Sequence, residues 1–189
     1  MKRALAAALP FVLFGQMSGA ADYATAMQTY MEFEIRFWAE DPTLVAAITA
    51  ANAERAGFDQ VRINALDTAW RAEVGQAATP TITPILENAA ANFLREQIAA
   101  TGGKVTEAFI TDNVGLNVAA STVTSDMWQG DEDKFTKVFP VGPEGTFMSE
   151  IKLDQSTQTN QGQISIAITY PSGAVIGTLT VGINADGLM

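Results

Sequence analysis

The hydrophobic pattern of this chain changes from the period of a helix to the period of a strand at the Gly102-Gly103 pair. Upstream, apolar residues recur at spacings of three and four, which is typical of amphipathic helices; the first such series is Met27, Tyr30, Phe33 and Phe37. Downstream, apolar and polar residues alternate, as in β-strands. Helices followed by strands predict an α+β domain, with the helices on one face of an antiparallel sheet.

Four helical segments are expected before residue 103. The first begins near Asp22 and carries the series above, which predicts one buried stripe. Met31, Ile35 and Trp38 widen this stripe, so the helix is expected to pack on more than one side. Asp41-Pro42 supplies an N-cap and a proline at the first helical position, so a second helix begins there. The third and fourth are expected over residues 61–74 and 85–101, with a linker between them.

Five strands are expected after residue 103, separated by turns rich in glycine, proline and asparagine. Their expected ranges are residues 104–111, 116–121, 146–154, 164–170 and 175–183. A long irregular insertion, residues 122–143, interrupts the series and contains a short helical segment. Because the helices take one face of this sheet, the insertion is expected to cover the other and to form a ligand pocket there.

The N-terminus has the pattern of a secretion signal. Lys2 and Arg3 precede an apolar run over residues 4–14, and small residues follow at Gly19-Ala20-Ala21. The rival interpretation is an uncleaved anchor, but a membrane span needs about 20 apolar residues and this run is about half as long. We therefore expect a signal peptide over residues 1–21, a helical part over 22–103 and a sheet part of the same domain over 104–189. The mature protein is expected in the periplasm or secreted.

Charge and missing residue types exclude several functions. Removing residues 1–21 takes two cations and no anions from a chain of net charge −10, which leaves −12. Such an acidic protein is repelled by nucleic acid and by anionic membranes. The chain has no cysteine and no histidine, which excludes Ser-His-Asp and Cys-His catalysis and histidine zinc sites. No cofactor and no metal site are predicted, although chemistry based on carboxylates alone and an all-oxygen calcium or magnesium site stay open.

The insertion supplies the candidate ligand-binding residues, because it mixes hydroxyl, indole, amide and charged side chains. With the end of the fourth strand, the candidates are Thr124, Asp126, Trp128, Gln129, Lys134 and Tyr170. A carboxylate beside an indole suits a cationic ligand, whereas Lys134 suits a dicarboxylate. The alternatives are that Trp128 fills the core, that Asp131 and Glu132 only begin a helix, and that Tyr170 faces the core.

Three segments in this order resemble the PDC/Cache family of extracytoplasmic sensor domains, in its free-standing, secreted, single-module form. They are residues 109–121 with the turn motif D-x-x-G, residues 124–134, and the closing strand at 176–183. The resemblance implies a PAS-like five-stranded sheet, a long N-terminal helix behind it and a ligand pocket on the far side. It also implies that Asp112 and Gly115 form the turn, and that Asp126, Trp128 and Gln129 line the pocket.

The function expected from these observations is an exported, non-catalytic sensor domain for a small metabolite: an amino acid, an amine or an organic acid. Most members of the family lie between two transmembrane helices. This chain contains neither these helices nor a signalling domain, so a separate membrane receptor is the expected partner. Two alternatives come from other classes. One is a carboxylate-based hydrolase that uses Asp126 with Asp131 or Glu132, and the other is an acidic protein-interaction module.

Overall fold

The computed structural model describes residues 17–155 and 157–189. Most of the expected signal peptide, residues 1–21, lies outside these ranges, so both the peptide and its cleavage site stay predictions. Within the described ranges no helix combines the length and apolar character that a membrane span requires.

The N-terminal helix contains a wider turn that changes which side chains it buries. It runs through α1 (Met17–Tyr30), the π-helical segment η1 (Met31–Ile35) and α2 (Arg36–Ala39). The prediction that Phe33 and Phe37 belong to its buried stripe is wrong, since they are 69% and 66% exposed. A π-turn has more residues per turn than an α-turn. The buried stripe therefore follows a spacing near four, through Met27, Met31, Ile35 and Trp38.

Each of the next three long helices begins at a side-chain cap. Asp41, Asp59 and Asn88 accept a backbone N–H at the start of α3 (Pro42–Glu54), α4 (Gln60–Glu73) and α6 (Ala89–Ala100). The expected fourth helix is divided, because the short α5 (Thr83–Leu86) ends at its C-cap Glu87 and Asn88 then caps α6. The amide of Asn88 also donates to the carbonyl of Val118 at 3.1 Å, which attaches this break to the sheet.

The strands form one antiparallel sheet with the order β2-β1-β6-β5-β3. A sixth strand, β4, also pairs with β5, beyond the end of β3. The sheet is therefore five positions wide, and the single strand expected over residues 146–154 is divided into β3 and β4. The bounds are β1 (Val105–Thr111), β2 (Asn117–Ala120), β3 (Thr146–Met148), β4 (Lys152–Asp154), β5 (Thr159–Thr169) and β6 (Val175–Asn184).

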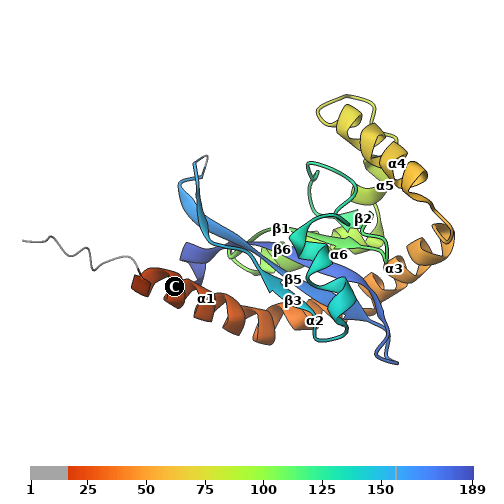
Figure 1. Cartoon of the computed structure of the whole chain (residues 1–189). Helices are drawn as coiled ribbons and strands as arrows, with labels where there is room; N and C mark the ends of the chain where they lie inside the picture. The colour runs from red at the N-terminus through yellow and green to blue at the C-terminus, as the bar shows by residue number, and fades with distance from the viewer. Residues whose placement is uncertain (1–16, 156) are drawn as a thin grey trace, which may run out of the picture.

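The two faces of the sheet differ in chemistry. Residues directly opposite one another share a face, and Ile110, Leu179 and Ile166 form one such row that packs against α1, η1, α3 and α6. The next row, Phe109, Thr180 and Ser165, points to the opposite side. The apolar face buries the main core against these helices, and Figure 1 shows the helices beside the sheet. The α+β fold with helices on one face of an antiparallel sheet is confirmed.

The opposite face, called here the roof-side face, is covered by residues 122–143, called here the roof segment. The roof segment includes α7 (Asp133–Thr136) and the short η2 (Phe139–Val141), and it buries Phe135 and Val138. The C-terminal η3 (Ala185–Leu188) returns to α1, so the C-terminus lies beside the N-terminal helix (Figure 1). The helix α4 projects from the body at the end that carries β2 (Figure 1).

Candidate functional site

The D-x-x-G turn between β1 and β2 fixes the position of the roof segment. The carboxylate of Asp112 is fully buried and accepts the backbone N–H groups of Val114 and Leu116 at 3.0 and 2.9 Å. Gly115 has a positive φ of +86°, and a Cβ atom there would lie 2.5 Å from the Cα of Gly130. Only glycine fits both the backbone angle and the close approach.

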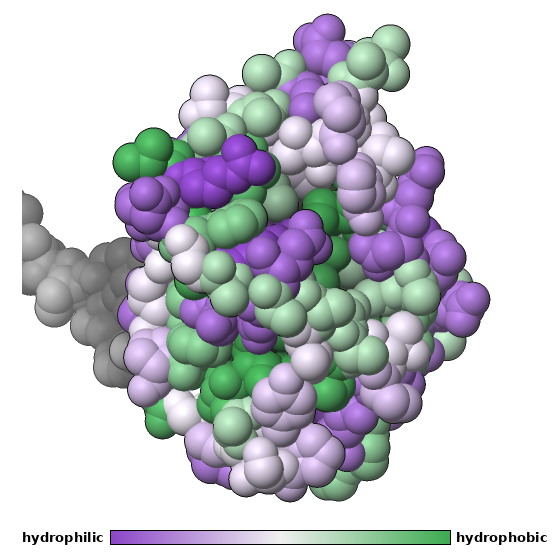
Figure 2. Space-filling model, turned by 90° about the vertical axis from the view of Figure 1, so that its right-hand side faces the viewer, coloured by the Kyte–Doolittle hydropathy of each residue, from purple (hydrophilic) through white to green (hydrophobic). Residues whose placement is uncertain are grey.

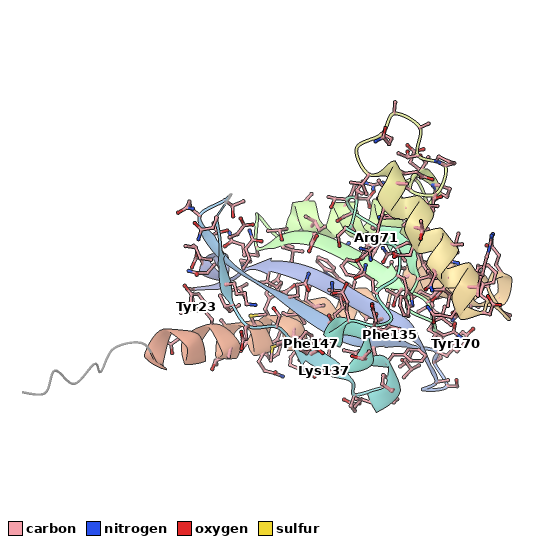
Figure 3. The ribbon with its side chains drawn as sticks, turned by 45° about the horizontal axis from the view of Figure 1, so that its top comes forward. Tyr23, Arg71, Phe135, Lys137, Phe147 and Tyr170 are labelled. Atoms are coloured by element: carbon pink, nitrogen blue, oxygen red, sulfur yellow. The ribbon has the colours of Figure 1, made fainter. Side chains whose placement is uncertain are left out.

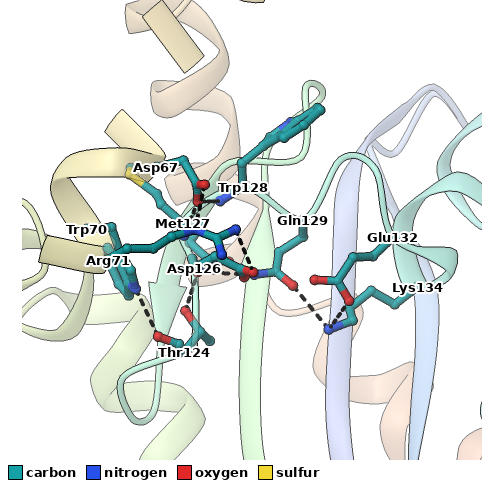
Figure 4. Close-up of polar contacts among 11 residues, drawn as sticks. Asp67, Trp70, Arg71, Thr124, Asp126, Met127, Trp128, Gln129, Glu132 and Lys134 are labelled. Carbon is teal, nitrogen blue, oxygen red and sulfur yellow. Dashed lines mark hydrogen bonds and ion pairs between the residues drawn. The ribbon is translucent and has the colours of Figure 1, made fainter. Parts of the chain in front are cut away.

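Four of the candidate residues in the roof segment form a chain of polar contacts (Figure 4). The Gln129 amide donates to the carboxylate of Asp126, and the ammonium group of Lys134 donates to Gln129 Oε1 at 3.1 Å. The hydroxyl of Thr124 donates to the carbonyl of Asp126 at 2.6 Å. Lys134 also pairs with Glu132 at 2.9 Å. The structure thus brings these side chains together, and each already has partners within the chain.

Helix α4 binds this loop through residues that the sequence analysis missed. Asp67 accepts the backbone N–H groups of Met127 and Trp128 at 3.0 and 3.1 Å. Arg71 pairs with Asp126 at 3.2 Å and with Asp67 at 2.8 Å. The hydrogen bond to Asp67 is the largest cause of the raised pKa of Arg71. The only sequence signal was the i, i+4 spacing of Asp67 and Arg71 on a helix.

The two aromatic candidates have contacts of structural residues. The indole N–H of Trp128 donates to the carbonyl of Val114 at 2.8 Å, which joins the roof segment to the β1–β2 turn. Tyr170 is half-buried and packs against the helix-side core near the β5–β6 hairpin. Figure 3 shows Tyr170 at the hairpin, apart from Phe147 and Lys137.

A layer of buried hydroxyl and amide groups lies between the sheet and the roof segment. The hydroxyl groups of Thr111 and Thr178 are 2.7 Å apart, and those of Ser165 and Thr180 are 2.9 Å apart. Asn117 is also fully buried, and its Oδ1 has no hydrogen-bond partner within the described part of the chain. Buried polar groups are costly when unpaired. The hydroxyl groups of this layer satisfy one another, whereas Asn117 Oδ1 does not have such a partner within the described residues.

Beside the covered layer, the roof-side face opens into a groove of about 540 Å³. On its floor, Glu107 and Gln163 flank Gly182 from the two neighbouring strands. Its walls include Lys137, the C-cap of α7, and Phe147 of β3, which Figure 3 shows close together over the sheet. The groove is therefore open, polar and built on the most extensively paired strands of the sheet.

The charged groups of the groove differ in how strongly contacts within the chain hold them. Lys137 pairs with Asp133 at 2.7 Å and lies 5.2 Å from the centre of the Phe147 ring. Glu107 Oε1 accepts a hydrogen bond of 3.3 Å from the Gln163 amide. Such a site can bind a small polar molecule through a carboxylate, an amide and an aromatic ring.

A second groove, of about 620 Å³, lies between α3 and the α5–α6 region, with mainly alanine side chains and Val118 in its lining. Figure 2 views the molecule from the side of α3 and the β5–β6 hairpin, where hydrophobic residues gather in recesses among hydrophilic ones. Of its four polar lining residues, Arg55 pairs with Asp112 and Asn88 donates to Val118, which leaves Thr43 and Glu54 to orient a ligand. In residues 17–155 and 157–189, no group of three or more acidic side chains is placed to hold a metal ion.

No family model and no curated protein matches this chain. Solved structures do match. The sensor domain of the V. cholerae histidine kinase DctB is 10% identical with a TM-score of 0.45, and the match covers 90% of this chain and 55% of that one. The ligand-binding domain of the Campylobacter jejuni chemoreceptor Tlp3 with 4-methylisoleucine is 16% identical with a TM-score of 0.41, covering 88% and 61%. The same domain with L-valine is 15% identical with a TM-score of 0.39, covering 92% and 66%.

The chain spans between about half and two thirds of the length of these matched structures. All three matched structures are described as sensor or ligand-binding domains.

Proposed function

We propose that this chain is an exported sensor domain that binds a small polar molecule in the groove on the roof-side face. The observation that carries this proposal is the groove itself, about 540 Å³ in volume and lined by charged, amide and aromatic side chains. Small-molecule sites commonly have volumes of about 300–1,000 Å³ and a few convergent polar groups. The groove lies on the face opposite the helices, where the resemblance to the PDC/Cache family places a ligand.

The contacts of the roof segment support a sensing role for the groove. Asp133 of α7 and its C-cap residue Lys137 line the groove directly, and the neighbouring Lys134 contacts Gln129. From Gln129 the contacts continue to Asp126 and then to Arg71 of α4. A ligand that moves α7 would therefore change contacts that reach α4. We propose that Asp126 and Gln129 position the roof segment, while groove residues touch the ligand.

We propose no catalytic role. An acid–base pair needs carboxylates that are free to exchange protons with a substrate. Asp126 is engaged by Arg71 and Gln129, and Glu132 pairs with Lys134. These contacts favour a binding function over the carboxylate-based hydrolase. The partner that receives the signal is proposed to be a separate membrane receptor, and the protein is proposed to reach it in the periplasm or outside the cell.

A thermal-shift screen against amino acids, amines and organic acids tests the proposal. A ligand that binds only the native state raises its stability, by about 2.7 kcal/mol at a hundredfold excess over Kd. Gln163→Trp fills the groove and should abolish the shift. Thr169→Trp lies on the same strand but outside the groove lining and should preserve it. A hit that stabilises both variants equally would contradict binding in the groove.

A further inference from the structure

We propose that the groove selects a small organic ammonium ion, and that Glu107 is the carboxylate that binds it. This inference rests on the proposed binding function and adds the chemical class of the ligand. The sequence suggested Asp126 as the carboxylate that binds a cation, and here Glu107 has that role instead.

Glu107 is a half-buried carboxylate without a cationic partner. No ion pair within residues 17–155 and 157–189 includes it. Its one side-chain hydrogen bond is the 3.3 Å contact from the Gln163 amide. Partly buried carboxylates are stabilised by a charged donor, and an ammonium group forms such a charge-assisted bond. The Gln163 amide orients the carboxylate and leaves acceptor positions open.

Gly182 provides the space over which this carboxylate lies. It is opposite Glu107 on β1 and Gln163 on β5, in the middle of the sheet. A Cβ atom at position 182 would lie 2.7 Å from Glu107 Cγ and 2.7 Å from Thr106 Oγ1. A glycine inside a strand weakens it and often marks a site of close approach. Here the missing side chain lets the Glu107 carboxylate extend over β6 towards Gln163.

The remaining charges of the groove favour a cation over an anion. Its carboxylates are Glu107, Asp133 and Glu150, against the two ammonium groups of Lys137 and Lys152. The ammonium group of Lys137 is already held by Asp133 and by the Phe147 ring, so an anion would depend mainly on Lys152. The acidity of the whole chain, with a net charge of −10, also raises the local concentration of cations.

Calorimetric titrations of the purified protein test the inference with the ammonium ions putrescine, choline and ethanolamine, and with succinate as the anionic probe. At least one ammonium ion should bind, and Glu107→Gln should weaken its binding about tenfold or more, the scale of a lost charge-assisted hydrogen bond. Glu96→Gln removes an exposed carboxylate of α6 that lies outside the groove lining, and it should change Kd by less than about twofold. Gly182→Ala should also weaken binding, because its Cβ displaces the Glu107 side chain.

The melting temperature of each unliganded variant separates binding from folding. Unliganded Glu107→Gln should melt close to the parent, so that its loss of affinity reports on binding. A loss of affinity in Gly182→Ala supports the inference only if Glu107→Gln loses affinity as well. If none of the three ammonium ions binds, or if Glu107→Gln leaves their binding unchanged, the inference is wrong. Succinate binding that Gln163→Trp abolishes would overturn this inference and leave the proposed function intact. A complete absence of hits in the metabolite screen would instead overturn the proposed function.

Discussion

The guanidinium group of Arg55, the C-cap residue of α3, donates to the carboxylate of Asp112 directly after β1, with 2.7 Å between Nη1 and Oδ2. The Asp112 side chain is fully buried and that of Arg55 is 11% exposed. Arg55 also donates to the backbone carbonyl of Asn117 at 3.2 Å. One ion pair therefore joins the helical layer to the turn on which the roof segment is built.

Arg55→Met should destabilise the fold by about 3–5 kcal/mol, because it leaves a buried carboxylate without its cation. Arg36→Met is the matched control. Its pair with Glu32 is 31% and 38% exposed, and its loss should cost about 0–1 kcal/mol. Urea unfolding curves measure both free energies of unfolding. Equal and small losses would mean that the Arg55–Asp112 pair does not hold the two layers together.

Asp126→Asn should lower the melting temperature while leaving the affinity of the groove nearly unchanged. The substitution removes the charge that pairs with Arg71 but keeps an oxygen for the Gln129 amide. The free energy of unfolding should fall by about 0.5–1.5 kcal/mol, the net value of an ordinary hydrogen bond. The opposite result, lower affinity at an unchanged melting temperature, would support the original prediction that Asp126 binds the ligand.

The sequence predicted the layers of the fold because both hydrophobic periods are strong in it. Phe109, Val118, Ile166 and Val181 lie in the strands expected from that alternation, and all four are buried. The error in the first helix has a local cause. A stripe at spacings of three and four assumes α-helical turns, and the π-helical segment Met31–Ile35 rotates Phe33 and Phe37 into solvent.

The groove was harder to predict than the roof segment. Thr124, Asp126, Gln129 and Lys134 attract notice because they are polar residues close together in a loop. Glu107, Gln163 and Gly182 come from three different strands, and only the register of those strands brings them together. Each of them also looks like an ordinary outward-facing position of an alternating strand. Long-range pairing of this kind has no signal within a single sequence window.

The rotated stripe of the N-terminal helix leads to a paired prediction. Met31→Ala should cost about 2–5 kcal/mol, because Met31 is 1% exposed in the core. Phe33→Ala should change stability by no more than about 0.5 kcal/mol, because the Phe33 side chain is mostly in solvent. Thermal unfolding of the two variants provides the comparison. A larger loss for Phe33→Ala would mean that the helix is rotated relative to the structure described here.

The contact between the two ends of the chain should depend on pH. The backbone N–H of Asn160 is the largest cause that lowers the pKa of Asp186 from its ordinary value of 3.8, followed by the hydroxyl of Tyr23. A lowered folded pKa means that ionised Asp186 stabilises the native state above the unfolded pKa. This stabilisation is lost as the pH falls below 3.8 through the folded pKa.

Asp186→Asn serves as the control, since it cannot ionise. The difference in melting temperature between parent and variant should be constant above about pH 5 and should shrink as the solution becomes more acidic. A difference that stays constant to the lowest pH at which both proteins fold would show that Asp186 does not contribute through its charge.

The most direct test of the central claim is chemical-shift mapping by NMR with the strongest small-molecule hit. If the groove on the roof-side face is the binding site, the backbone amides of Glu107, Gln163 and Gly182 should shift most, together with those of α7. Smaller shifts should continue through Gln129 to Arg71 on α4. Shifts confined to the alanine-lined groove between α3 and α6, or to no common site, would contradict the account.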